Sequence, residues 1–295
     1  KELQQPEYGR PRRGQMLFCF QHFGPAPRLL DAALASGATF LAFETVGEAD
    51  GSLPLLAPMS AIAGRLSVPI GTWCLQKQNG GSGVLLSGLD GVAPGHIVIL
   101  GAGNVGSNAL AMAHGIGAHV TVFASTDRRF ASLRARFPEV EFRVGTDRLP
   151  DAAASSDLII GAVLRPGQMS PKLVTRAMLR SMRAGSALVD VGIDQGGIAE
   201  TSRPSSHSQP IYLEERVVHY CVPNMPAACA RTASLALDRA VLPYVLELAG
   251  RGLAGALAAR PDLETAVQVH AGKVTHEHLA RDTRRAHVPL EELVA

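Results

Sequence analysis

The sequence has 295 residues, of which 46% are hydrophobic and 18% charged, and its formal net charge is +2. This composition excludes a disordered chain, and the length is sufficient for two domains of ordinary size. The 28 basic and 26 acidic residues nearly balance, and no basic block exceeds Arg10-Pro11-Arg12-Arg13, which argues against a nucleic-acid partner.

The first 57 residues predict one βαβ unit. Apolar runs at 16–20 and 39–44 predict strands, and residues 26–36 between them predict a helix. Residues 61–75 predict a further helix, longer than the first.

The middle of the chain alternates apolar strands with helical patterns, which is typical of a parallel sheet covered by helices on both faces. The strands are expected at 97–100, 119–123, around Phe142 and Val144, and at 158–164, 187–191 and 217–222. A helix is expected at 104–116, with Val105, Ala109, Met112 and Ala113 facing inward, and another at 171–182 with Pro171 in its first turn. These elements predict a Rossmann-type, doubly wound α/β fold.

A long apolar helix is expected from Pro226 towards Gly250, followed by a polar tail. We therefore expect a dinucleotide-binding domain at 58–230 and a smaller α/β substrate domain built from 1–57 and 231–295, with the two long helices connecting them. No run of about 18 uninterrupted apolar residues occurs, so no membrane-spanning helix is expected.

The four cysteines form no C-x-x-C pair, and each lies in an apolar stretch. This usage is typical of buried thiols in a reducing compartment, and we expect a cytoplasmic protein without a metal site.

Residues 101–106 read Gly-Ala-Gly-Asn-Val-Gly, the pattern G-x-G-x-x-G. The pattern alone is weak, but here it follows an apolar strand and opens a helix within a βαβ context. Gly101 permits the tight turn, Gly103 lets the backbone approach a pyrophosphate, and Gly106 allows helix and strand to pack closely. A structural turn without ligand is the alternative.

Several segments resemble alanine dehydrogenases, and together they run over nearly the whole chain. The segments are 54–65 (PLLAPMSAIAGR), 101–108, 161–167 (GAVLRPG), 189–203 (VDVGIDQGGIAETSR) and 219–226 (HYCVPNMP). IDQGG and NMP are the more specific of these, and the related transhydrogenase α subunit looks different at both.

The resemblance implies roles for individual residues. Lys1 matches the family's substrate-binding lysine, His22 its catalytic histidine, and Asp194 the aspartate beside the substrate and the nicotinamide ribose. The residues that fall where the family contacts the dinucleotide, together with our own candidates at the glycine turn and after the second and third strands, are Ser60, Gly101, Gly103, Asn104, Val105, Gly106, Ser125, Arg128, Arg129, Thr146, Val163, Leu164, Val191, Ile193, Asp194, Arg203, Asn224 and Met225.

The implied reaction is the oxidative deamination of L-alanine or a similar small amino acid, or the reverse reductive amination of the 2-oxo acid. An imidazole can exchange protons with a carbinolamine in both directions, a carboxylate can support an iminium charge, and an ammonium can hold the substrate carboxylate. The family resemblance also suggests a homo-oligomer, a hexamer.

We expect NADP(H) to be preferred over NAD(H). An acidic residue about 20 positions past the glycines usually accepts the ribose hydroxyls of NAD. Here Ala124 stands at that place, and Ser125, Thr126, Arg128 and Arg129 follow. Asp127 is the alternative ribose ligand, and the two arginines could equally be the exposed face of a helix.

Three departures from the family leave rival hypotheses open. The family's N-terminal segment, with its substrate-carboxylate arginine, does not precede Lys1 here, so we expect dinucleotide binding but poor alanine turnover. Ala61 and Ala124 also replace acidic residues. The alternatives are an imine reductase of altered substrate, a dinucleotide-binding paralogue without its own chemistry, and a transhydrogenase-like hydride carrier.

Overall fold

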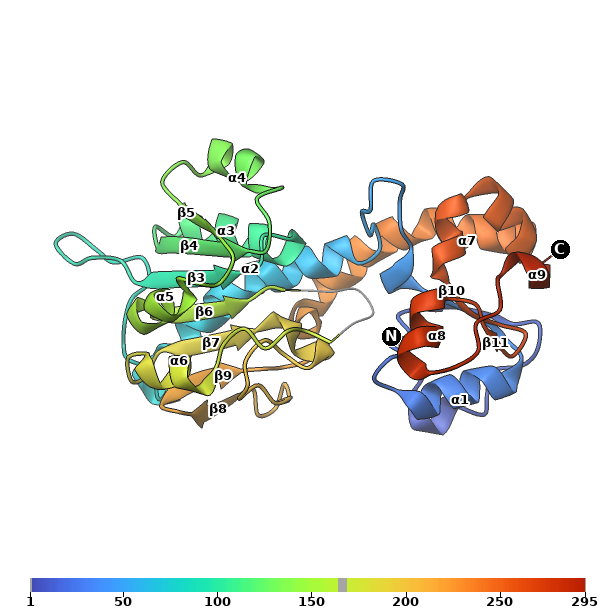
Figure 1. The fold of residues 1–295 in the computed structure, drawn as a ribbon, viewed down its shortest axis with the longest axis horizontal. Helices are drawn as coiled ribbons and strands as arrows, with labels where there is room; N and C mark the ends of the chain where they lie inside the picture. Colours follow the sequence, from blue (N-terminus) through green and yellow to red (C-terminus); the bar gives the residue numbers. More distant parts are fainter. Residues whose placement is uncertain (1, 164–168, 295) are drawn as a thin grey trace. The chain divides into compact units, whose positions relative to one another are not determined.

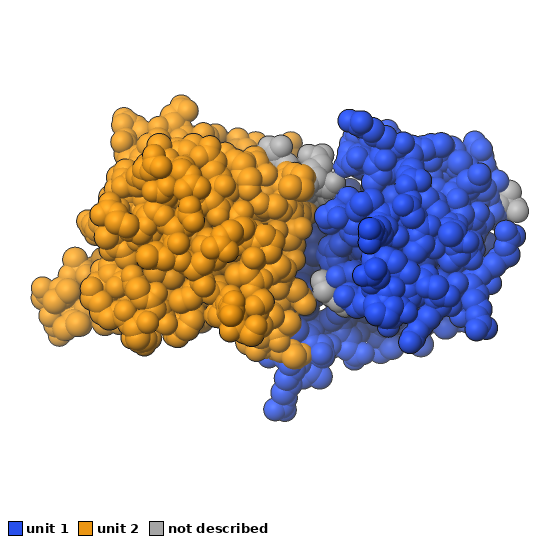
Figure 2. Space-filling model, turned by 90° about the horizontal axis from the view of Figure 1, so that it is seen from below, with its two compact units in different colours: residues 1–59, 166–168, 231–295 blue, residues 60–165, 169–230 orange. Residues whose placement is uncertain are grey.

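The computed structural model describes residues 2–163 and 169–294, and the chain divides into two compact units. Of the described residues, unit 1 comprises 2–59 and 231–294, and unit 2 comprises 60–163 and 169–230 (Figure 2).

Unit 2 is built on a seven-stranded sheet with the order β5-β4-β3-β6-β7-β9-β8 (Figure 1). Its strands are β3 (His96–Leu100), β4 (His119–Ala124), β5 (Glu141–Val144), β6 (Leu158–Gly161), β7 (Ala187–Asp190), β8 (Ile211–Glu214) and β9 (Val217–Tyr220). Every pairing is parallel except that of β8 with β9. The predicted doubly wound α/β fold is confirmed, with an antiparallel edge strand that the sequence analysis missed.

Helices cover both faces of this sheet because its central strand is apolar on both sides. Ile97 and Ile99 point into one core, shared with α2 (Ala57–Cys74), α3 (Asn104–Gly115) and α4 (Phe130–Arg136). Val98 and Leu100 point into the other, shared with α5 (Leu149–Ser155) and α6 (Arg176–Ser181). Successive strand residues face opposite sides, so a continuous apolar strand requires two cores.

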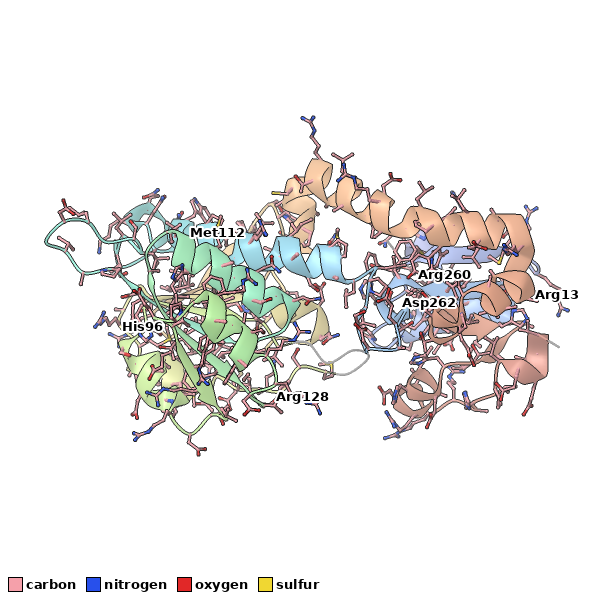
Figure 3. All side chains as sticks on the ribbon, turned by 90° about the horizontal axis from the view of Figure 1, so that it is seen from above. Arg13, His96, Met112, Arg128, Arg260 and Asp262 are labelled. Atoms are coloured by element: carbon pink, nitrogen blue, oxygen red, sulfur yellow. The ribbon has the colours of Figure 1, made fainter. Side chains whose placement is uncertain are left out.

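Some expected details were wrong. Met112 lies on the outer side of α3 and is 38% exposed (Figure 3), and Leu110 fills the inner position instead. The helix expected from Pro171 begins only at Arg176, because the hydroxyl of Thr175 accepts a hydrogen bond from the backbone N–H of Met178 at 3.2 Å and caps it there.

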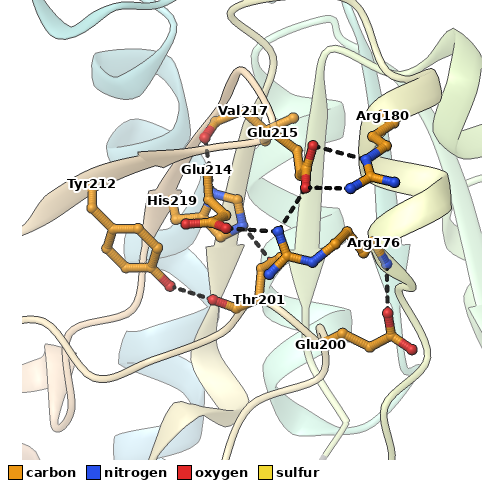
Figure 4. A network of polar contacts seen from close by, with 9 residues as sticks. All are labelled: Arg176, Arg180, Glu200, Thr201, Tyr212, Glu214, Glu215, Val217 and His219. Carbon is orange, nitrogen blue, oxygen red and sulfur yellow. Dashed lines mark hydrogen bonds and ion pairs between the residues drawn. The ribbon is translucent and has the colours of Figure 1, made fainter.

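Charged side chains join the edge strand β8 and the turn after it to α6 (Figure 4). The Arg176 guanidinium donates to Glu214 at 2.7 Å and to Glu215 at 2.6 Å, and Arg180 donates to Glu215 at 3.0 Å. These two arginines hold the pKa of Glu215 at about 2. Ion pairs to α6, as well as the backbone hydrogen bonds to β9, therefore hold the edge strand β8 in place. This limits its pairing with other chains.

Unit 1 contains a four-stranded sheet with the order β1-β2-β10-β11. β1 (Met16–Cys19) and β2 (Thr39–Ala42) are parallel and joined by α1 (Pro27–Ser36), as predicted. The expected polar tail is instead folded. It supplies β10 (Val267–His270), which pairs antiparallel with β2, as well as β11 (Lys273–Val274), α8 (Glu277–Thr283) and α9 (Glu291–Val294).

The long helix α7 (Ala230–Ala259) contains Pro243, and Gly252 interrupts it with a φ of +67°. By length and composition, Met225–Ala259 is one helix that could cross a membrane, and 17% of the apolar window is buried. A single helix of this kind is weak evidence for a membrane span. Six short 3₁₀ turns complete the described elements: Gln5–Glu7, Phe43–Thr45, Lys77–Asn79, Val191–Gln195, Met225–Cys229 and Pro261–Ala266.

Candidate functional site

The glycine-rich turn joins β3 to α3 at the centre of the unit 2 sheet. Gly101 has a φ of +110°, and a Cβ on it would lie 2.5 Å from the carbonyl oxygen of Ala162. A Cβ on Gly106 would collide with the carbonyl oxygen of Gly101. Both positions therefore require glycine, whereas a Cβ on Gly103 would meet nothing within 4 Å and would fill open space beside the turn.

The residues at the start of α3 fit a bound pyrophosphate. Gly103 is the N-cap and, lacking a side chain, leaves the first-turn N–H groups without a side-chain cap. Uncapped N–H groups and the positive end of the helix dipole favour an anion. Val105 is buried beneath this turn and Asn104 is exposed on it.

The strand order reverses at β3, where β4 lies on one side and β6 on the other. In open α/β sheets, ligands bind beside the carboxyl ends of the strands at such a switch point. Val163 follows β6, Thr146 follows β5, and Val191 follows β7 at this same edge.

The segment after β4 carries the groups expected to distinguish the two cofactors. Ala124 is partly buried, whereas Ser125, Thr126, Arg128 and Arg129 are exposed. Figure 3 labels Arg128 on this turn. The Arg129 guanidinium reaches back to the glycine turn and donates to the side-chain oxygen of Asn104 at 3.2 Å. Asp127 is also exposed, and its backbone carbonyl accepts a bond from Phe130.

Asp194 lies in the 3₁₀ turn Val191–Gln195 that follows β7, beside the buried side chain of Ile193. Both of its carboxylate oxygens lie 3.2 Å from the backbone nitrogen of Asn224, which donates to them. The two most specific segments of the sequence, IDQGG and NMP, thus meet at one carboxylate. Asn224 adopts a left-handed φ of +50°, and Met225 after it is buried.

Asp190 and Lys172 hold the loop that carries Asp194, and the sequence analysis missed both. The buried Asp190 carboxylate accepts the N–H groups of Gly192 at 3.0 Å and Ile198 at 2.7 Å, as well as the hydroxyl of Ser202. Burial raises the pKa of Asp190. The Lys172 ammonium donates to two carbonyl oxygens across the Gly196-Gly197 turn, at 2.6 and 2.9 Å.

Arg203 and Ser60 are two further residues that we expect to contact the cofactor. The Arg203 guanidinium stacks 3.8 Å from the centre of the Tyr212 ring, and its backbone N–H donates to the Tyr212 hydroxyl at 3.0 Å. Ser60 lies in the first turn of α2. Further along α2, a Cβ on Gly64 would collide with the carbonyl oxygen of Val105, so this glycine brings α2 close to α3.

His22 lies in unit 1, three residues after the end of β1, with a left-handed φ of +49°. Its backbone N–H donates to the Glu44 carboxylate at 2.8 Å. Its ring nitrogen Nδ1 lies 3.0 Å from the Glu2 carboxylate. Neither glutamate was among the residues expected from the sequence, although Glu2 stands beside Lys1.

Two of the expected residues, Lys1 and Leu164, lie outside the described residues. Among the residues that the structure describes, no group of three or more His, Cys, Asp or Glu side chains could hold a metal ion. The four cysteines are all free thiols.

Comparison with known proteins gives a consistent result over nearly the whole chain. The family model described as alanine dehydrogenase/PNT, C-terminal domain, matches residues 67–277, and the corresponding N-terminal domain matches residues 1–63. The chain is 47% identical over 285 residues to alanine dehydrogenase of Halomonas elongata, covering 95% of this chain and 76% of that protein. It is 42% identical to alanine dehydrogenase of Bacillus subtilis, covering 99% and 78%.

Solved structures agree. An L-alanine dehydrogenase structure superposes with a TM-score of 0.89 at 43% identity, covering 96% of this chain and 79% of that one. A transhydrogenase from Sinorhizobium meliloti superposes with a TM-score of 0.73 at 22% identity, which is a likeness of fold alone.

Proposed function

Because the chain belongs to the alanine dehydrogenase/PNT family, we propose that it is an alanine dehydrogenase, an oxidoreductase acting on the CH–NH₂ group of L-alanine or a similar small amino acid. The similarity to alanine dehydrogenases over nearly the whole chain carries this proposal. The net reaction converts the amino acid, water and the oxidised dinucleotide into the 2-oxo acid, ammonia, the reduced dinucleotide and a proton.

The glycine turn, the start of α3 and the segments after β4, β6, β7 and β9 would hold the nicotinamide dinucleotide. When bound, the dinucleotide supplies the acceptor for the hydride that leaves the amino acid's Cα. The protein's contribution is binding, orientation and the movement of protons.

We assign proton exchange to His22. Its imidazole would take a proton from the water that adds to the imine carbon, and would return one as the C–N bond of the carbinolamine breaks. Glu2 and Glu44 support this role, because a ring and a backbone that are both held by carboxylates are already oriented for proton transfer.

We assign charge stabilisation to Asp194. The imine formed from an amino acid carries a positive charge when protonated, and an ionised carboxylate beside it lowers its energy. Asp194 is exposed at the carboxyl edge of the sheet, with its position fixed by the N–H of Asn224. Lys1 would bind the substrate carboxylate.

We further propose that NADP(H) is preferred over NAD(H). Ala124 offers no carboxylate to accept the ribose hydroxyls or to repel a 2′-phosphate. Arg129, which already reaches the glycine turn through Asn104, and Arg128 beside it offer cationic partners for a phosphate.

We also propose a cytoplasmic homo-oligomer. The free thiols are those expected in a reducing compartment. A row of exposed apolar side chains on α7 would be covered by a second copy of the chain.

The test is turnover. With L-alanine and NADP⁺ or NAD⁺, the protein should produce the reduced dinucleotide, measured by its absorbance, at the low rate expected from the sequence, and the reverse reaction should consume it with pyruvate and ammonia. His22→Ala should lower the rate about 10²–10⁴-fold while dinucleotide affinity hardly changes. Tight dinucleotide binding without turnover of any small amino acid would instead favour the non-catalytic paralogue.

A further inference from the structure

We propose that Glu2 and Glu44 are positioning residues for His22: Glu44 fixes its backbone, and Glu2 holds the ring proton on Nδ1, so that Nε2 is the nitrogen that accepts a proton. The use of Nε2 in turnover rests on the proposed function, but the position of the ring proton does not.

The backbone is held by the register of the sheet. β1 and β2 are parallel with Cys19 opposite Ala42, so Gln21 and Glu44 stand at matching places just beyond the paired strands. The Glu44 carboxylate accepts from the N–H of Gln21 at 3.0 and 3.2 Å and from the N–H of His22 at 2.8 Å. The left-handed φ of His22 is strained for a residue with a side chain. One carboxylate that satisfies two successive N–H groups offsets this strain and sets the direction in which the His22 side chain leaves the chain.

Phe20 and Glu2 both contact the ring. It stacks against Phe20, with ring centres 5.8 Å apart and planes within 14° of each other. Its Nδ1 lies 3.0 Å from Oε2 of Glu2, and the two side chains are 36% and 21% exposed. An ionised carboxylate can only accept, so Nδ1 must be the donor. In the neutral ring the proton is then on Nδ1, and Nε2 carries the lone pair.

The charges around this histidine come from three segments. Glu2 belongs to the N-terminal segment, Glu44 to the turn after β2, and Cys19 to β1. Burial raises the pKa of the Cys19 thiol, and the negative charges of Glu44 and Glu2 act in the same direction, against the opposing positive charge of the amino terminus. Among the described groups of these segments, Glu2 and Glu44 are the two carboxylates that contact His22 directly.

The contact with Glu2 determines which ring nitrogen of His22 can act as a base. In a free neutral imidazole the proton is mainly on Nε2. A protonated Nε2 has no lone pair in the ring plane and cannot accept another proton. With Nδ1 engaged by Glu2, nearly every neutral His22 ring is ready to act as a base through Nε2. In the deamination direction, that is the form the enzyme needs.

The ring proton can be located directly by long-range ¹H–¹⁵N correlation on the full chain, at a pH where the histidines are neutral. The resonances of His22 are identified by their loss in His22→Gln. In the wild-type protein, Nε2 should show the high ¹⁵N shift of an unprotonated ring nitrogen. In Glu2→Ala that signature should move to Nδ1, whereas Glu2→Gln, which keeps an acceptor oxygen, should restore the wild-type pattern.

Glu7→Ala is the matched control, because Glu7 lies in the same segment and its carboxylate accepts from the backbone N–H of Gln4 at 2.8 Å. It should leave the His22 signals unchanged. An unprotonated Nδ1 in the wild-type protein, or the same pattern in Glu2→Ala, overturns the proposal. If the spectra behave as expected and no amino acid is turned over, the positioning of His22 stands and the proposed function fails.

Discussion

The carboxylate of Asp194 could bind the dinucleotide or stabilise the charge of the iminium, and a substitution can distinguish the two roles. Asp194→Asn keeps an oxygen that can accept from the N–H of Asn224, so the loop should retain its shape. The lost charge should lower kcat by about 10²-fold, because it matters most while the iminium forms. Steady-state kinetics and dinucleotide binding on the same sample check this. A change confined to the dinucleotide dissociation constant would make Asp194 a ribose ligand only.

Ala124 is the residue on which the cofactor preference depends. We expect NADPH to bind more tightly than NADH, and Ala124→Asp to reverse this order. A carboxylate at the end of β4 would accept the ribose hydroxyls and repel a 2′-phosphate, and a charge-assisted contact of this kind corresponds to roughly 10- to 150-fold in affinity.

Titration calorimetry with both dinucleotides on both proteins measures the ratio directly. Ser181→Asp, which adds the same charge at the exposed end of α6, is the control and should leave the ratio unchanged. Tighter NADH binding to the unmodified chain would refute the preference.

Some site residues could be predicted from the sequence and others could not. The difference is whether the contacts that define them lie close together or far apart along the chain. The glycine turn could be predicted because its pattern G-x-G-x-x-G occupies six consecutive residues between an apolar strand and a helix. His22 and Asp194 came from the family resemblance. The groups that hold them could not be predicted, because Glu44 reaches His22 through strand register, and the bond that Asp194 accepts comes from a segment 30 residues further on.

At the scale of elements, α8 offers a pH-dependent feature. Its N-cap is His276, whose Nδ1 accepts from the backbone N–H of Leu279 at 3.3 Å, which requires an unprotonated nitrogen. Burial lowers the pKa of His276 from 6.5 to about 4, helped by the nearby His278 and His287 and opposed by Asp282 and Glu277.

A histidine with a lowered pKa stabilises the folded state above its unfolded pKa, and this contribution is lost as the pH falls from about 6.5 towards 4. Because the side chain is partly exposed and solvent screens it, we expect a loss of about 1–2 kcal/mol, comparable to that of a helix cap. Urea unfolding at pH 7 and pH 5 measures it. His276→Asn keeps a cap that does not titrate, so its stability should fall less over this interval. Equal losses in the two proteins would contradict the assignment.

Elements of unit 2 were predictable because alternation of strand and helix is a local signal. The tail of unit 1 was not. Val267, Val269 and Val274 are buried, but they are scattered among polar residues and face partners at the other end of the sequence. β8 was missed for a similar reason, since its outward Leu213 is 60% exposed and its attachment to α6 is made by charged side chains.

At the scale of the whole molecule, the exposed face of α7 predicts association. Leu235, Leu242 and Leu246 lie at spacings of seven and four residues, which place them on one side of the helix, and they are 57%, 49% and 64% exposed. We expect light scattering to give a mass that is a multiple of 31.0 kDa.

Leu246→Glu should shift this distribution towards the single chain, because a charge in an apolar contact between copies is costly. Leu213→Glu changes an equally exposed leucine on β8 and should leave the mass unchanged. A single-chain mass for the unmodified protein, or equal dissociation of both variants, would show that this face of α7 does not join copies of the chain.

The pairing of β2 with β10 fixes an order of events during protein synthesis. The side chains of Thr39 and His270, one on each strand, are hydrogen-bonded although 231 residues separate them. A ribosome adding about 5–20 residues per second needs roughly 10–50 s to travel that far. All of unit 2 emerges within this interval and can fold, while one edge of β2 waits for its partner. The newly made chain therefore passes through a state in which unit 2 can be complete while β2 in unit 1 still has an unpaired edge, and an unpaired strand edge is prone to aggregate.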